Sequence, residues 1–227
     1  MTDLDPLVLR QVSLFASLAP DDLAVLAGNL QRRRYARGQV IFRQGDAGAS
    51  LYLIEEGLVK IAVSTPGGKA LVLRLLGPRD FFGELSLLDG EPRSADAIAH
   101  EDCRLLLLQR EDFLRFVEAR PGVAKGLLAT VSRRLRYTTQ QVQDAAFLDV
   151  PARLARVLLE LAHIPAGLAD DQLIDPRPTQ AELAEMVGAT RESVNKWLGV
   201  YEREGLIQRQ RGAIRVVRPD ALRKRIY

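Results

Sequence analysis

Residues 122–147 read GVAKGLLATVSRRLRYTTQQVQDAAF, and the rest of the chain is organised around this stretch. Its apolar residues recur at alternating intervals of three and four positions, which is the a/d seam of a coiled coil. Such a seam predicts a parallel partner helix, most simply the same helix of a second copy. The predicted dimerisation residues are Leu128, Val131, Leu135, Thr138, Val142 and Ala145.

Polar residues interrupt this seam near its middle. Thr138 occupies a seam position, Thr139 lies beside it, and the preceding turn holds three arginines, among them Arg134. One polar residue in a seam often fixes register and oligomeric state at some cost in stability. The alternative is that a polar ligand binds here, and the seam alone does not decide between the two.

Length and composition limit the classes of protein to consider. The chain has 227 residues, enough for two domains that each bury a core, with 47% hydrophobic and 27% charged residues. No run approaches the ~20 apolar residues of a membrane span, and the N-terminus does not resemble a signal peptide, so we expect a cytoplasmic protein without membrane contact. The single cysteine, Cys103, excludes CxxC zinc sites and four-cysteine iron–sulfur ligation within one chain, and we predict no metal site.

The charge is unevenly distributed along the chain. Residues 191–227 hold ten Lys/Arg and four Asp/Glu, whereas the whole chain carries a net charge of only +3. The remainder is therefore net acidic. A basic C-terminal end on an acidic body suits a polyanionic partner, although a solvated basic tail would show the same bias.

The local patterns predict an α+β protein. Residues 7–30 have helical spacing, and residues 31–110 consist of short Val, Ile and Leu-rich runs between Gly, Pro and Asp turns, which predicts an antiparallel sandwich or barrel. A short helix over 111–119 precedes the long seam helix. Pro151 disfavours helical geometry at the residue before it, so we place a hinge near residues 148–151. A helix over 152–162 and a polar loop over 164–177 are expected next.

Within the β-rich part, residues 82–95 read FGELSLLDGEPRSA, and we call this segment the cassette. Glu84 is suited to sugar hydroxyls and Arg93 to a bidentate grip on phosphate, while a glycine-containing turn offers backbone amides. Ser86 and Ser94 add hydroxyls. These residue types predict an anion site with a sugar clamp. The alternative is a surface loop in which Glu84 and Arg93 are solvated or pair with each other.

Residues 178–217 have the pattern of a winged helix-turn-helix. Thr179 and Glu182 form a capping box that starts a helix over 180–187, a turn over 188–190 follows, and a second helix runs over 191–204. Two short strands around a basic turn then form the wing. Recognition helices contact base edges with their N-terminal residues, and wing arginines contact phosphates. The predicted DNA-binding residues are Thr179, Gln180, Arg191, Glu192, Ser193, Asn195, Lys196, Arg209 and Arg211.

The stretch GELSLLDGEPRSA resembles the phosphate-binding cassette of cyclic-nucleotide-binding domains. Residues 14–218 as a whole resemble the Crp/Fnr family of bacterial transcription regulators, in particular its cAMP receptor protein branch. The resemblance implies an N-terminal cyclic-nucleotide-binding β-roll, jelly-roll-like, over residues 1–120, a long dimerisation helix over 121–148 and a winged helix-turn-helix DNA-binding domain over 149–227. No nucleophile–base pair or catalytic loop supports an enzyme, so no catalytic residue is predicted.

The same resemblance implies roles for individual residues. Glu84 would hold the ribose 2′-hydroxyl, Arg93 the cyclic phosphate, and Thr138 and Thr139 the adenine, one from each subunit. Three positions depart from the cAMP receptor branch: Thr139 stands where a serine is typical, Arg74 replaces a small hydroxyl residue and Lys196 replaces an arginine. The implied ligand-binding residues are Gly83, Glu84, Leu85, Ser86, Arg93, Ser94, Arg134, Thr138 and Thr139.

Together these features predict a homodimeric regulator that binds a pseudo-palindromic site in double-stranded DNA under the control of a cyclic nucleotide, with cAMP as the expected effector. By family analogy, residues 165–172 would contact RNA polymerase. The alternative is a ligand-independent regulator of the same family whose effector site is vestigial.

Overall fold

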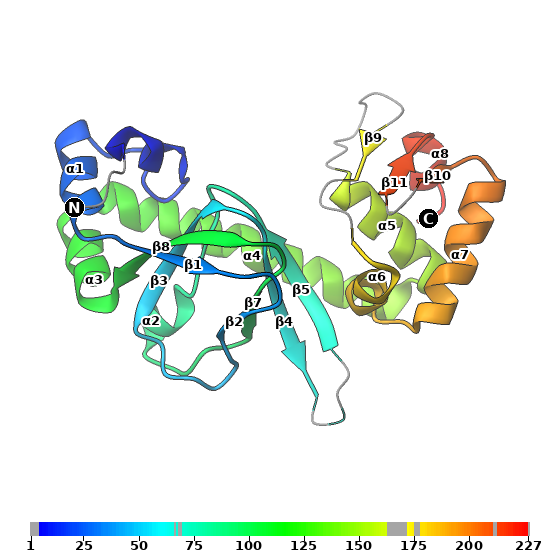
Figure 1. The fold of residues 1–227 in the computed structure, drawn as a ribbon, viewed down its shortest axis with the longest axis horizontal. Coiled ribbons are helices and arrows are strands. Elements are labelled where there is room, and N and C mark those ends of the chain that lie inside the picture. Colours follow the sequence, from blue (N-terminus) through cyan, green and yellow to red (C-terminus); the bar gives the residue numbers. More distant parts are fainter. Residues whose placement is uncertain are drawn as a thin grey trace. The chain divides into compact units, whose positions relative to one another are not determined.

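The computed structural model describes residues 5–65, 67, 70–162, 172–174, 178–210 and 213–226 (Figure 1). Two compact units divide the chain: residues 1–64 with 73–137, and residues 65–72 with 138–227. The first contains antiparallel sheets, the second contains a helix-turn-helix, and one long helix continues from the first into the second. The predicted α+β fold is therefore confirmed.

Two four-stranded sheets form the β-rich part. One has the order β1-β8-β3-β6 and the other has the order β2-β7-β4-β5. In the first sheet Leu51 pairs with Leu108 and Leu53 with Leu106, so that apolar side chains of β3 and β8 lie opposite each other. The strands are β1 (Gln31–Tyr35), β2 (Val40–Phe42), β3 (Ser50–Glu56), β4 (Val59–Ser64), β5 (Ala70–Leu76), β6 (Phe81–Phe82), β7 (Asp96–Ala99) and β8 (Cys103–Gln109).

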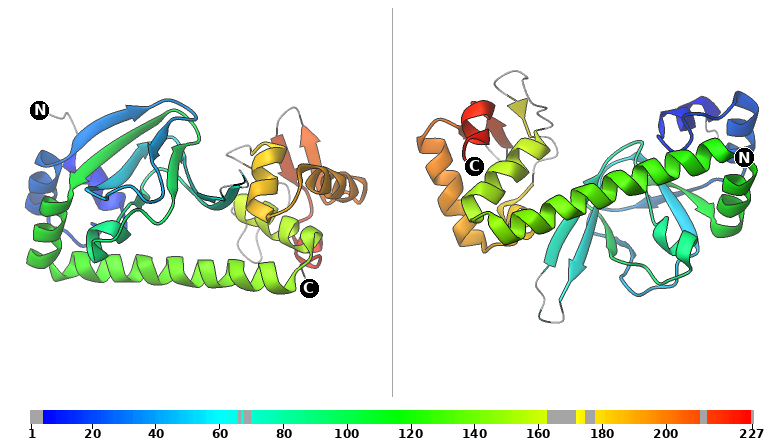
Figure 2. Two further views of the ribbon diagram at one scale, coloured as in Figure 1. Left: turned by 90° about the horizontal axis from the view of Figure 1, so that it is seen from below. Right: turned by 180° about the vertical axis from the view of Figure 1, so that it is seen from behind.

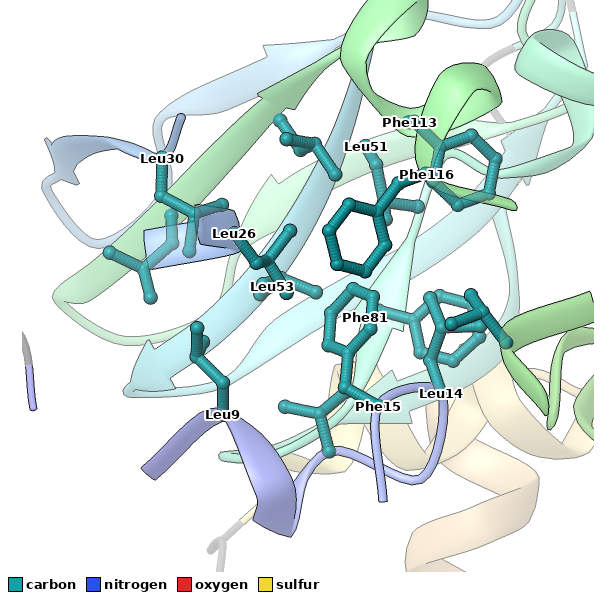
Figure 3. Close-up of a cluster of buried hydrophobic side chains, with 14 of the residues drawn as sticks. Leu9, Leu14, Phe15, Leu26, Leu30, Leu51, Leu53, Phe81, Phe113 and Phe116 are labelled. Atoms are coloured by element: carbon teal, nitrogen blue, oxygen red, sulfur yellow. The ribbon is translucent and has the colours of Figure 1, made fainter. Parts of the chain in front are cut away.

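One hydrophobic core joins the first sheet to the helices around it. Phe15, Phe81 and Phe113 are fully buried there, and Phe15 meets Phe116 edge-to-face with ring centroids 6.4 Å apart (Figure 3). A separate cluster that includes Tyr52 and Phe82 lies between the sheets. The helices that contribute to the first core are η1 (Pro6–Gln11), α1 (Pro20–Gly28), α2 (Leu85–Asp89), α3 (Arg110–Ala119) and α4 (Pro121–Phe147).

Helix α4 has a buried and an exposed side, and Figure 2 shows it as one unbroken helix. Val123 and Leu127 are buried in the first core, and Val131 packs against it. The other seam residues face outward: Leu128, Leu135 and Val142 are 68%, 67% and 63% exposed. The predicted seam is thus an apolar stripe that a single chain leaves accessible to solvent.

The second unit contains its own core. Leu183, Val194 and Leu198 are buried between the helices, and the hydroxyl of Tyr201 donates to the carbonyl of Pro151 over 2.7 Å. A three-stranded sheet has the order β10-β11-β9. The elements are α5 (Val150–Leu161), β9 (Gln172–Leu173), α6 (Gln180–Val187), α7 (Arg191–Arg203), β10 (Ile207–Gln210), β11 (Ala213–Val216) and α8 (Pro219–Arg223).

Several local predictions need correction. The helix expected over 152–162 begins earlier, at Val150, because the carboxylate of Asp149 accepts from the amide of Ala152 at 3.0 Å and Pro151 fits the first turn, where its missing amide is not needed. The loop expected over 164–177 contains the short strand β9, which pairs with β11. Part of the cassette, expected as a turn, is the helix α2 (Leu85–Asp89). No helix in the described ranges is long and apolar enough to cross a membrane.

Candidate functional sites

The cassette backbone follows from two glycines in the left-handed region. Gly83 has φ +83° and links β6 to α2, and Gly90 ends α2 with φ +78°. Gly83 has a second requirement, because a Cβ at this position would lie 2.6 Å from Nη1 of Arg93. The glycine thereby lets the arginine side chain pass against the backbone of the turn.

Arg93 is the central charged group of the cassette and only 4% exposed. Its Nη1 donates to the carbonyl of Gly83 at 2.6 Å and its Nη2 to the carbonyl of Ser50 at 2.8 Å, while its guanidinium lies 4.3 Å from the ring centre of Phe42. Burial lowers the pKa of Arg93, an effect that Tyr52 and Glu84 oppose.

The charge of Arg93 is held in place but not neutralised. Among the described residues no carboxylate lies within ion-pair distance of it, and its buried Nε has no hydrogen-bond partner. The interpretation in which Glu84 and Arg93 simply pair or are solvated is therefore wrong. A buried cation that is fixed by carbonyls and lacks an anionic partner is an arrangement that can accept an anion.

Glu84 is 3% exposed and contacts the long helix rather than Arg93. Its Oε1 accepts from Nη1 of Arg134 at 2.5 Å, and Nη2 of Arg134 donates to the carbonyl of Phe81. One arginine of α4 therefore holds both a cassette carboxylate and the strand that precedes it. Any ligand hydroxyl that binds Glu84 must share or replace this contact, which connects the cassette directly to α4.

The remaining cassette residues have different degrees of burial. Ser86 is buried, whereas Leu85 and Ser94 are exposed. On α4, Thr138 and Thr139 follow Arg134 by about one helical turn and are exposed. The structure thus brings Glu84, Arg93 and Arg134 together.

The helix-turn-helix is fixed by its caps. The hydroxyl of Thr179 accepts from the amide of Glu182 at 3.2 Å, and Glu182 accepts from the amide of Thr179 at 2.7 Å, which confirms the predicted capping box. Gly188, with φ +66°, ends α6, and Thr190 caps α7 by accepting from Ser193. These caps fix where the recognition helix begins.

The start of α7 presents polar side chains to solvent. Arg191, Glu192, Asn195 and Lys196 are exposed, and Ser193 is half-buried. The ammonium of Lys196 lies 5.7 Å from the ring centre of Trp197. Exposed cations and a carboxylate at a helix start are groups that can contact base edges in a major groove.

The wing is tied to α7 by a network that was not predicted from the sequence. Glu202 accepts from the amide of Arg209 at 3.0 Å and from its Nε at 2.8 Å, which lowers the pKa of Glu202. Nη1 of Arg209 donates to Oδ1 of Asn195, and so does Nε2 of Gln180, both at 3.1 Å. Asn195 thus joins two other predicted DNA-binding residues, Gln180 and Arg209, while Arg211 lies outside the described residues.

Comparisons with known proteins bear on both sites. A family model for the cyclic nucleotide-binding domain matches residues 32–120, and a model for the Crp-like helix-turn-helix domain matches residues 152–225. The chain is 34% identical to a CRP-like cAMP-activated global transcriptional regulator of Mycobacterium tuberculosis, over 96% of this chain and 98% of that protein. It is 39% identical to the cyclic AMP receptor protein of Thermus thermophilus, over 89% and 91%.

A solved structure supports the same grouping. The c-di-GMP responsive global regulator CLP of Xanthomonas campestris superposes with a TM-score of 0.74 at 26% identity, over 88% of this chain and 99% of that one. These relatives are transcriptional regulators, which are not enzymes.

Proposed function

This chain belongs to the Crp/Fnr family of transcription regulators, and from that membership we propose a homodimeric regulator whose binding to double-stranded DNA is controlled by cAMP. Family membership by itself establishes a DNA-binding regulator with a cyclic-nucleotide-binding domain. The choice of cAMP, the dimer and a pseudo-palindromic operator are the proposed part. We retain the division into residues 1–120, 121–148 and 149–227 as a proposal.

The observation that carries the proposal is the buried, un-neutralised charge of Arg93 beside the buried carboxylate of Glu84. A cyclic phosphate provides one negative charge for Arg93, and the adjoining ribose provides a hydroxyl that can donate to Glu84. The amides of Gly83 and Leu85 and the hydroxyls of Ser86 and Ser94 complete the proposed polar contacts.

The proposed coupling to DNA runs through α4. Ribose binding competes with Arg134 for Glu84, and the freed guanidinium is able to turn to the phosphate. Thr138 and Thr139, one from each subunit, are proposed to contact the adenine and thereby favour the paired arrangement of the two seams. A coupling of ~2–3 kcal/mol would raise operator affinity by tens-fold to about a hundredfold.

The proposed dimer supports DNA recognition by symmetry. Pairing of the exposed stripe at Leu128, Leu135 and Val142 gives a two-fold axis, so two α7 helices read half-sites about one helical turn apart. Arg191, Glu192 and Lys196 are the proposed base readers. We also propose a cytoplasmic location and contact with RNA polymerase, although most of residues 165–172 lie outside the described residues.

Calorimetric titration of the full chain with cAMP tests the effector, with c-di-GMP as a second ligand because one fold neighbour responds to it. The proposal predicts saturable cAMP binding at one site per subunit, lost in Arg93→Met. Binding of c-di-GMP alone would replace cAMP as the effector. If neither nucleotide binds, the proposal of cAMP as effector fails, and the alternative of a ligand-independent regulator with a vestigial site requires that cGMP also does not bind.

A further inference from the structure

Arg74 is a third arginine near the cassette, and the function proposed above gives it no role. It lies on β5, is half-buried, and its guanidinium carbon is 4.7 Å from the ring centre of Tyr137. The guanidinium of Arg74 therefore stacks on the ring of Tyr137, and this contact fixes the orientation of its N–H donors.

The hydrogen-bonding edge of Arg74 differs from those of its neighbours. Arg93 donates to two carbonyls, and Arg134 donates to a carboxylate and a carbonyl. In the part of the chain that the structure describes, Arg74 makes the stacking contact with Tyr137 but no hydrogen bond or ion pair. The contact with Tyr137 orients the N–H donors of Arg74, and no acceptor among the described residues binds them.

Arg74 is positioned by its contact with Tyr137 on α4. Tyr137 comes three residues after Arg134, so the two side chains lie on one face of the helix, one turn apart. Arg134 holds Glu84 and Tyr137 holds Arg74. Burial and the charge of Arg134 lower the pKa of Arg74, and Glu84 acts on both Arg74 and Arg93. The geometry places Arg74, through Tyr137, one helical turn along α4 from the contact between Arg134 and Glu84.

This arrangement matches the order of groups in a nucleotide. If Arg93 binds the phosphate and Glu84 the ribose, the base extends along α4 toward the turn that contains Tyr137. Thr138 and Thr139, proposed above to contact the base, follow Tyr137 directly, and the guanidinium of Arg74 adds a planar fork that can read a purine edge there.

Resting on the function proposed above, we propose that Arg74 recognises the O6 and N7 acceptors of a 6-oxopurine, so that cGMP is a second ligand of the cassette. A guanidinium fork donates to both acceptors at once, which is the commonest specific contact between arginine and guanine. Adenine presents an acceptor at N7 but a donor at N6, so it satisfies only one arm of the fork. Lysine, with a single ammonium, cannot reproduce the pair of parallel bonds.

The test is calorimetry on the full chain with cAMP, cGMP and cIMP at one salt concentration. Inosine has the O6 and N7 of guanine without its 2-amino group, so cIMP isolates the edge that Arg74 reads. We expect wild-type protein to bind cGMP and cIMP within about tenfold of cAMP, and Arg74→Lys to weaken both by roughly tenfold to a hundredfold. The affinity for cAMP should change less than threefold. Arg136→Lys, an exposed arginine on the same helix, is the matched control and should change none of the three.

The outcomes separate the two proposals. If cAMP binds but cGMP and cIMP do not, or if they bind equally well to wild type and Arg74→Lys, the role of Arg74 is wrong and the cAMP proposal stands. If cGMP and cIMP bind through Arg74 but cAMP does not bind, the inference holds and the choice of cAMP fails. If no nucleotide binds, both proposals fail.

Discussion

Replacing Arg93 with methionine should abolish nucleotide binding with little change in stability. The variant leaves the carbonyls of Gly83 and Ser50 without their donor, which costs about 1–3 kcal/mol for each buried acceptor. It also removes a buried charge that pairs with no carboxylate among the described residues, and whose burial costs several kcal/mol. Because these terms oppose each other and methionine fills much of the same volume, we expect the free energy of unfolding to change by less than about 1.5 kcal/mol.

The effect on binding should be much larger. Loss of one partner from a buried, hydrogen-bonded charge pair typically costs about 2–5 kcal/mol, so cAMP affinity should fall by roughly 30-fold to several-thousandfold. Urea unfolding followed by circular dichroism measures the first quantity, and calorimetry measures the second. Arg110→Met is the control, because Arg110 donates to the carbonyl of Leu87 on α2 and is exposed.

Two results would refute this reasoning. If Arg93→Met lowers the free energy of unfolding by more than about 4 kcal/mol, the arginine is a structural bridge rather than a poised anion site. If the variant binds cAMP as wild type does, the phosphate lies elsewhere.

Three further predictions concern other parts of the molecule. Arg79→Gly should raise the free energy of unfolding by about 0.5–1 kcal/mol, because Arg79 holds a φ of +76° that disfavours residues with a Cβ; an unchanged or lower melting temperature would contradict this. Leu135→Glu should shift sedimentation toward monomer while the chain keeps its helical circular dichroism, since this side chain is 67% exposed in a single chain; a persistent dimer would rule out the seam. The hydrogen bonds from Arg209 lower the pKa of Glu202 in the folded protein. The Glu202 carboxylate therefore adds to the free energy of unfolding above its unfolded pKa of about 4.3, and this contribution is lost as the pH falls through the lower folded pKa. The difference in stability between wild type and Glu202→Gln should therefore be present at pH 7 and vanish in acid, and a difference independent of pH would show that the carboxylate charge is not involved.

The elements with local signals were predictable from the sequence. The capping box at Thr179 and Glu182 fixed the start of α6, and the left-handed glycine at Gly188 fixed its end, because both signals lie within a few residues of the structure they determine. The strand β9 was not predictable, since two residues in a polar stretch become a strand only through pairing with β11, which is distant in sequence. Helix α2 was missed because five residues between two glycines are too short for a periodic pattern.

Residue types at the site were predictable, but their partners were not. Sequence reasoning selected Glu84 and Arg93 by chemistry and left open whether they pair with each other. The contacts that decide the matter, Arg93 with the carbonyl of Ser50 and Glu84 with Arg134, join residues 43 and 50 positions apart. The contact between Glu202 and Arg209 was not predictable for the same reason, because it depends on how β10 packs against α7.

The most direct test of nucleotide control is the affinity of the full chain for a DNA fragment selected from a random pool. It is measured by fluorescence anisotropy with and without cAMP at one fixed salt concentration. We predict that cAMP raises the affinity by tens-fold to about a hundredfold in wild type and leaves it unchanged in Arg93→Met. Equal affinities with and without cAMP in the wild-type protein would contradict the account.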